Sequence, residues 1–188
     1  MNIIESPLAD VFILEPKVWG DDRGYFFESY REDLLTKAVR KFHWVQDNES
    51  KSSKGVLRGL HYQLPPFAQS KLVRVIHGTV LDVAVDIRKG SPNFGKHFAI
   101  ELSEENKKQL LIPRGFAHGF LVLSETAIFS YKVDNYYSKE SERSILWDDP
   151  TIGINWQFPV TELVLSEKDR VGKLISEVDL FPLKDLYV

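Results

Sequence analysis

The segment GVLRGLHYQLPP, residues 55–66, carries side chains that could perform acid–base chemistry. It places Arg58, His61 and Tyr62 within five positions of what otherwise has the pattern of a short β-strand ending at two prolines. A histidine held in one tautomer by a carboxylate can remove a proton near neutral pH, and a tyrosine can return one. An oxyanion formed between those steps requires a cation or donor nearby. From spacing alone, the same residues could instead be ordinary hydrogen-bonded groups of a structural strand.

The rest of the chain offers a candidate for every role in such a reaction. The candidates are His61 and His118 as bases, Tyr131 as the acid, Lys71 and Arg58 as cations, and Asp169 as the orienting carboxylate. Spacing alone does not single out these residues, because any chain of 188 residues contains such side chains.

A metal centre is the first alternative to acid–base catalysis. Metal sites in β-barrels commonly use two or three histidines with a carboxylate, often with His-x-His on one strand. The five histidines of this chain are well separated, and His-x-His does not occur. Cysteine is absent, which excludes a thiolate zinc site, a disulfide and a thiol nucleophile. We therefore expect no metal, although distant strands could still assemble a composite site.

These side chains must be positioned by a β-rich fold. Segments with strand character recur roughly every eight to twelve residues, separated by Gly, Pro, Asn and Ser. The predicted strands span residues 10–16, 24–30, 44–50, 55–62, 71–78, 79–87, 96–103, 108–113, 117–124 and 127–137. An apolar stripe with helical period occurs in residues 30–41. The pattern predicts an all-β sandwich or barrel with a few short helices.

The clearest alternation lies in TVLDVAVDIR, residues 79–88. Its odd-numbered positions from Leu81 to Ile87 are apolar, whereas Asp82 and Asp86 lie on the opposite face. That face is either a solvated surface or the lining of a cavity, in which Asp82 could support a histidine. Composition does not distinguish the two.

Length and charge limit the classes of function. The 188 residues indicate a single domain, 1–188, with enough length for a substantial core. A net charge of −3, from 24 basic and 27 acidic residues, argues against nucleic-acid and membrane-surface partners. The start, MNIIESPLAD, lacks the features of a signal peptide, and no apolar run approaches the roughly 20 residues that span a bilayer. We expect a cytoplasmic protein.

A series of motifs resembles one enzyme family. The matching segments are GDDRGYFFESY (20–30), QDN (46–48), GVLRGLHYQ (55–63), KLVR (71–74), DVAVDIR (82–88), SPNFGK (91–96), LIPRGFAHGF (111–120), YKVDNYY (131–137), WDDPTIGINW (147–156) and LSEKD (165–169). Together they resemble the dTDP-4-dehydrorhamnose 3,5-epimerases, in the same order and over about residues 3–170. The resemblance implies a cupin-type jelly roll, with a C-terminal extension to which it assigns no role.

The same resemblance implies catalytic roles. His61 would be the general base and Asp169 its dyad partner, with Tyr131 as the general acid. Lys71 would stabilise an enolate, assisted by His118.

Further positions would contact a nucleotide sugar. These are Arg23, Phe26, Glu28, Gln46, Asn48, Arg58 and Tyr137. Because the family's N-terminal strand crosses to a neighbouring subunit, Arg23 would serve the partner's site. The resemblance thus implies a homodimer with strand exchange, and neither a metal nor a cofactor.

The expected reaction follows from the family's substrate class, a dTDP-4-keto-6-deoxyhexose. Its C4 ketone acidifies the hydrogens on C3 and C5, so deprotonation and reprotonation can invert both carbons. The expected enzyme is an isomerase of dTDP-L-rhamnose and polysaccharide biosynthesis that converts dTDP-4-dehydro-6-deoxy-D-glucose to dTDP-4-dehydro-L-rhamnose. The alternatives are a mono-epimerase acting at C3 or C5 of a related sugar, a metal-dependent cupin and a non-catalytic sugar-binding cupin.

Simple strand alternation conflicts with two of these roles. It places His61 on the face of Leu57 and Gly59, and Arg58 on the opposite face. The resemblance, in contrast, has Arg58 and His61 contact one substrate. A β-bulge near Gly59, or an arginine that reaches around a barrel rim, would reconcile them.

Overall fold

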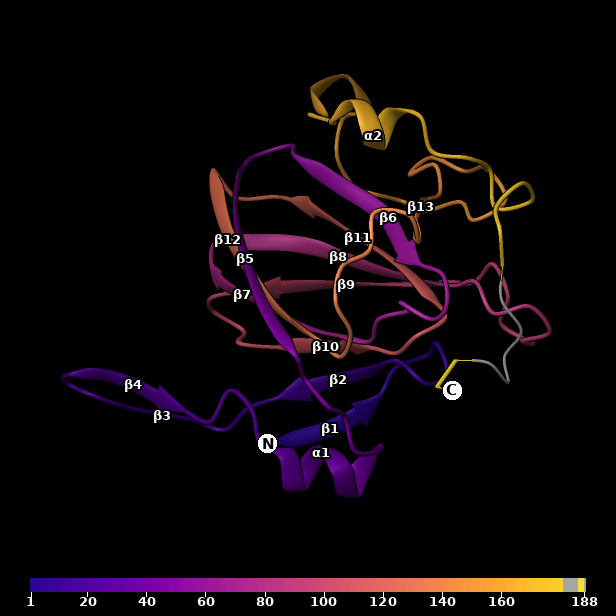
Figure 1. The fold of residues 1–188 in the computed structure, drawn as a ribbon. Helices are drawn as coiled ribbons and strands as arrows, with labels where there is room; N and C mark the ends of the chain where they lie inside the picture. Colours follow the sequence, from indigo (N-terminus) through magenta and orange to yellow (C-terminus); the bar gives the residue numbers. More distant parts are fainter. Residues whose placement is uncertain (181–185, 188) are drawn as a thin grey trace.

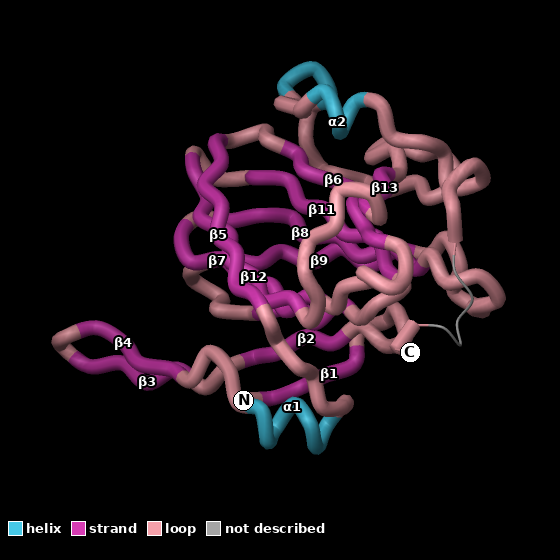
Figure 2. Tube along the Cα trace, in the orientation of Figure 1, coloured by secondary structure: helices cyan, strands magenta, loops and turns pink. Residues whose placement is uncertain are grey.

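The computed structural model describes residues 1–180 and 186–187, in which β-strands dominate up to Ser144 and loops follow (Figure 2). The strands form two antiparallel sheets that face each other (Figure 1). This arrangement confirms the all-β prediction.

One sheet has six strands. In spatial order they are β1 (Asn2–Glu5), β2 (Phe12–Glu15), β10 (Gln109–Ile112), β7 (Lys71–His77), β12 (Thr126–Val133) and β5 (Gln46–Ser53). The other sheet has five strands. In spatial order they are β13 (Glu142–Ser144), β6 (Leu57–Gln63), β11 (Phe116–Val122), β8 (Thr79–Asp86) and β9 (His97–Ser103).

The remaining elements lie outside these sheets. β3 (Val18–Asp21) and β4 (Gly24–Phe27) form a hairpin that projects away from the two sheets (Figure 1). The helical segments are α1 (Glu32–Ala38), η1 (Val160–Glu162) and α2 (Glu167–Arg170). Every strand predicted from the sequence is present, and the predicted helix at 30–41 is the shorter α1. The sequence did not predict β1, β3, β13, η1 or α2.

The main core lies between the two sheets. Val73 and Phe129 of the six-stranded sheet pack against Val80, Ala84 and Phe120 of the five-stranded sheet, and all are buried. The rings of Phe120 and Phe129 stack with their centroids 4.2 Å apart. Burial of each large apolar side chain stabilises the fold by on the order of 2 kcal/mol.

Strand β8 is buried on both faces. Its outward-facing Val83 and Val85 belong to a second core with Ile152 and Trp156 of the C-terminal part of the chain. Asp82 and Asp86 face inward and are fully buried. A solvated surface at residues 79–88 is therefore the wrong interpretation, because the C-terminal segment and the facing sheet cover the two sides of the strand.

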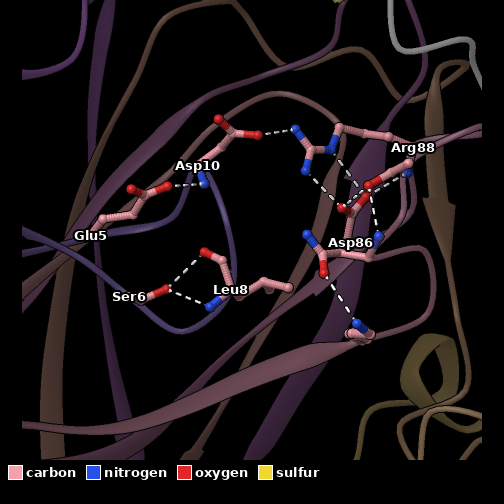
Figure 3. A network of polar contacts seen from close by, with 9 residues as sticks. Glu5, Ser6, Leu8, Asp10, Asp86 and Arg88 are labelled. Atoms are coloured by element: carbon pink, nitrogen blue, oxygen red, sulfur yellow. Dashed lines mark hydrogen bonds and ion pairs between the residues drawn. The ribbon is translucent and has the colours of Figure 1, made fainter.

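Asp86 is satisfied by a network at the end of β8 (Figure 3). The Arg88 guanidinium donates to both of its carboxylate oxygens, at 3.0 and 2.6 Å, and Ser91 Oγ donates at 2.6 Å. A further guanidinium nitrogen pairs with Asp10 at 2.5 Å. Because a buried carboxylate needs such partners, the network fixes the turn between β1 and β2 against the end of β8.

The strand that carries Arg58 and His61 contains a β-bulge. β6 pairs with β11 through His61↔His118 and Arg58↔Phe120. The two paired positions are three residues apart on β6 but only two residues apart on β11, so β6 has one extra residue. One extra residue reverses the alternation, and both Arg58 and His61 line the same cavity. The predicted bulge near Gly59 is confirmed.

Gly59 is required at this bulge, which gives a first prediction. Its φ is +142°, and a Cβ there would lie 2.5 Å from the Cα of Gly119. We expect Gly59→Ala to lower the free energy of unfolding by about 3 kcal/mol, measured by urea denaturation. Gly90→Ala is the matched control, because φ there is +91° with no atom within 4 Å of the added Cβ. Equal losses in the two variants would contradict the packing argument.

Candidate active site

Two adjoining cavities open between the sheets, and three predicted residues line both. The cavities have volumes of about 380 and 290 Å³, and His61, Lys71 and Tyr131 contribute to each. Arg58, His118 and Asp169 line only the smaller cavity. Gln46, Asn48 and Tyr137 line only the larger one. Most of the predicted site residues therefore meet in one place.

His61 and Asp169 form a hydrogen-bonded dyad. His61 Nε2 lies 2.6 Å from Asp169 Oδ1, so a carboxylate on the short helix α2 orients an imidazole on β6. The Gly59 N–H donates to the same oxygen at 3.2 Å, and Ser166 Oγ donates to Oδ2 at 2.6 Å. Burial raises the pKa of Asp169, but the hydrogen bonds from His61 and Ser166 outweigh it, and the pKa lies below its usual value. The carboxylate is therefore ionised near neutral pH.

Lys71 and Tyr131 face this dyad from the other sheet. They lie on β7 and β12, whereas His61 lies on β6. Burial lowers the pKa of Lys71 to about 8, although the negative charges of Asp82 and Glu142 raise it in part. Burial also raises the pKa of Tyr131, so its hydroxyl keeps its proton near neutral pH.

A second histidine–carboxylate pair lies beside the first. His118 is the cross-strand partner of His61, and its Nε2 lies 2.9 Å from Asp82 Oδ2. The support of a pocket histidine by Asp82, one of the two sequence alternatives, is thus confirmed. Burial lowers the pKa of His118 despite the opposing effect of Asp82, so the imidazole is neutral and Nε2–H donates to the carboxylate. The other oxygen of Asp82 is buried and has no hydrogen-bond partner among the described residues.

The rim of the site contains two residues that the sequence did not single out. Glu142 accepts a hydrogen bond from Tyr137 Oη at 3.0 Å and forms an ion pair with Lys168. Glu142 lines the larger cavity and Lys168 the smaller. Lys168 adjoins Asp169 within LSEKD and could have been proposed from that motif. Glu142 lies in a polar segment with no comparable signal.

Arg58 contacts the facing sheet. Its guanidinium Nε and Nη2 donate to Ser52 Oγ on β5 at 3.2 and 3.1 Å. Near the larger cavity, Gln46 Nε2 donates to Asn48 Oδ1 at 2.7 Å. These contacts orient polar groups along the rim of the site.

Three predicted contacts lie away from the two cavities that His61 lines. Arg23 and Phe26 belong to the projecting β3–β4 hairpin, and Glu28 follows it (Figure 1). Arg23 pairs with Asp21 of the same hairpin at 2.5 Å, and Glu28 lies 3.7 Å from Arg31. The structure of one chain therefore does not bring these residues to the dyad.

Residues 1–180 and 186–187 contain neither a cluster of metal ligands nor a membrane-spanning helix. No group of three or more His, Cys, Asp or Glu in these ranges is arranged to hold a metal ion. None of the helices formed by these residues has the length and apolar character needed to cross a membrane.

Comparisons with known proteins agree on one family. The family model described as dTDP-4-dehydrorhamnose 3,5-epimerase matches residues 5–177. The dTDP-4-dehydrorhamnose 3,5-epimerase of Shigella flexneri is 58% identical, over 96% of this chain and 99% of that protein.

Solved structures give the same result and confirm the jelly-roll prediction. The dTDP-6-deoxy-D-glucose-3,5-epimerase of Legionella pneumophila, in complex with dTDP-4-keto-L-rhamnose, superposes with a TM-score of 0.91 at 49% identity, covering 95% of this chain and 94% of that one. A 3'-monoepimerase from Streptomyces bikiniensis in complex with dTDP-quinovose is more distant, with a TM-score of 0.85 at 30% identity over 92% and 87% of the two chains.

The charge on Lys71 can be tested directly. We expect its ammonium to titrate at about pH 8 rather than at the usual value of 10.5, observed by NMR of ¹³C-lysine-labelled protein and assigned by loss of the signal in Lys71→Arg. Asp82→Asn should lower this pKa further, because it removes a negative charge that favours the ammonium. Asp47→Asn is the control, since Asp47 is exposed and pairs with Lys132. A Lys71 pKa near 10.5 would show that burial does not lower it, and a pKa unchanged by Asp82→Asn would show that the Asp82 charge does not act on the ammonium.

Proposed function

The chain belongs to the dTDP-4-dehydrorhamnose 3,5-epimerase family, and we propose that its cavity epimerises C3 and C5 of dTDP-4-dehydro-6-deoxy-D-glucose to form dTDP-4-dehydro-L-rhamnose. The observation that carries the proposal is the division of the reactive groups between two facing sheets. His61 and Asp169 stand on one side of the cavity, and Tyr131 and Lys71 on the other. Inversion requires proton removal from one face of a carbon and proton return to the other.

The proposed reaction begins with His61. Its imidazole takes a proton from the carbon next to the C4 ketone, and the electron pair of the C–H bond moves to the ketone oxygen as an enolate. Asp169, ionised at neutral pH, stabilises the resulting imidazolium. The ammonium of Lys71 stabilises the enolate oxygen, with more effect in a cavity poor in water than in bulk solvent.

Tyr131 completes the inversion. As the enolate collapses to the ketone, the carbon takes the proton of the tyrosine hydroxyl on the face opposite His61. The raised pKa of Tyr131 supports this role, because the group is protonated when the enolate forms. Solvent then restores the proton of the tyrosine and accepts that of the imidazolium, so the cycle balances without an oxidant, a reductant or a cofactor.

The rim residues fit the nucleotide part of the substrate. Arg58 supplies a cation next to the dyad, which suits the negative charge of a diphosphate. Gln46 and Asn48 supply amide groups, and the exposed ring of Tyr137 supplies an aromatic surface. These positions support the predicted binding roles of the four residues.

A homodimer would complete the site. The β3–β4 hairpin projects beyond the body of the chain (Figure 1). Its Trp19, Tyr25 and Phe26 side chains are exposed. Exposed aromatic clusters of this kind are typical of interaction surfaces. We propose that the hairpin lies against a second copy, where Arg23, Phe26 and Glu28 reach the partner's cavity.

Isotope incorporation separates the double epimerase from a mono-epimerase. We expect incubation of the 4-keto sugar nucleotide in D₂O to give a product with deuterium at both C3 and C5, as determined by NMR, because each inverted carbon takes its new hydrogen from solvent. A reaction without enzyme at the same pH and time is the control for spontaneous exchange next to the ketone. Deuterium at only one of the two carbons would contradict the proposal and favour a mono-epimerase.

A further inference from the structure

Gln63 is a buried polar residue for which the proposed reaction has no role. It ends β6, two positions after His61, and its side chain lines the larger cavity with 6% of the residue exposed. Its amide nitrogen donates to the carbonyl oxygens of Phe67, at 2.7 Å, and Tyr136, at 3.2 Å. Its amide oxygen accepts from the N–H of Ser138 at 2.6 Å. A buried amide with three backbone partners is strongly fixed in orientation.

These three bonds join two loops of the cavity rim. Phe67 lies in the loop after β6, whereas Tyr136 and Ser138 lie in the loop after β12. Asn135 Nδ2 reinforces the junction by donating to the carbonyl oxygen of Pro66 at 2.8 Å. Gln63 is the member of this junction that originates in the base-bearing strand.

The bonds of Gln63 bracket Tyr137. Tyr136 and Ser138 are its immediate chain neighbours, so the amide holds the backbone on both sides of this tyrosine. The hydroxyl end of Tyr137 is held by Glu142, which is the cross-strand partner of Gln63 in the pairing of β6 with β13. Two paired positions thus fix the ring at both ends, while 57% of the residue stays exposed at the cavity mouth.

We propose that Gln63 is a positioning residue that holds the ring of Tyr137 as a preformed platform for the base of the nucleotide. The inference rests on the proposed function, which makes a nucleotide sugar the ligand of this cavity. Bases stack on aromatic rings, and a ring that is already fixed loses less conformational freedom on binding. Gln63 acts through Tyr137 and takes no part in proton transfer, so it governs nucleotide affinity rather than turnover.

The test uses Gln63→Glu, with dTDP binding measured by calorimetry and turnover measured on the 4-keto sugar nucleotide. The carboxylate would face two carbonyl oxygens, at Phe67 and Tyr136, to which the amide donates in the wild type. We expect the Kd for dTDP and the KM to rise about tenfold, with kcat within about threefold of wild type. Asn106→Asp is the matched control. The Asn106 amide also makes three hydrogen bonds to the backbone, but it lies in the loop between β9 and β10 and lines neither cavity. The Kd for dTDP and the KM of Asn106→Asp should therefore stay at their wild-type values.

A double-mutant cycle distinguishes positioning from a general structural effect. If Gln63 acts through Tyr137, Gln63→Glu combined with Tyr137→Ala should weaken dTDP binding no more than Tyr137→Ala alone. The inference would be overturned if the losses of dTDP affinity in the two single variants add in the double variant, or if Gln63→Glu lowers kcat and leaves the Kd unchanged. Gln63→Met, which removes the hydrogen bonds without adding charge, serves if the glutamate variant does not fold. Wild-type activity and dTDP binding are measured first, so a failure of the proposed function is seen separately.

Discussion

The site depends on one buried carboxylate, that of Asp169. It accepts hydrogen bonds from the imidazole of His61, the backbone N–H of Gly59 and the hydroxyl of Ser166. These donors come from the candidate base, from the bulge that brings Arg58 to the same cavity, and from the start of α2. An ionised carboxylate in a buried position is stable only with such partners, so the fold of the C-terminal segment and the orientation of the base depend on each other.

The facing sheet supplies the opposite chemistry. Its half-buried Lys71 and Tyr131 have pKa values displaced in opposite directions, and in both cases desolvation favours the neutral form. The lysine has a pKa of about 8 and stays largely cationic at neutral pH, while the tyrosine stays protonated. Asp82 contributes to this balance, because its charge favours the ammonium of Lys71 while one of its oxygens accepts from His118. A jelly roll with different polar groups on its two inner faces is therefore suited to move a proton across a substrate.

The sequence predicted the elements better than their edges or their contacts across the fold. Alternation and turn residues were sufficient for the core strands, whereas β1, β3 and β13 are short strands without a fully buried residue. Alternation in residues 79–88 was detected, but its two faces could not be assigned, because burial there depends on distant segments. The motifs that resemble the epimerases predicted the dyad, Lys71 and Tyr131 as cavity residues. The places of Glu142 and Gln63 at the cavity rim depend on the pairing of β13 with β6, which the sequence does not reveal. The proposed contact of Arg23 with a cavity depends on a second chain.

If base and acid approach the substrate from opposite faces, removal of the acid in Tyr131→Phe should separate hydrogen exchange from inversion. In D₂O, this variant should introduce deuterium into the recovered dTDP-4-dehydro-6-deoxy-D-glucose with its configuration retained, because His61, 24% of whose side chain is exposed, can return a deuteron to the face from which it took the proton. Epimerisation should fall by about 10²- to 10⁴-fold. The matched variant His61→Asn should abolish both exchange and inversion. Inversion by Tyr131→Phe at the wild-type rate, or loss of exchange together with inversion, would show that His61 and Tyr131 do not act from opposite faces.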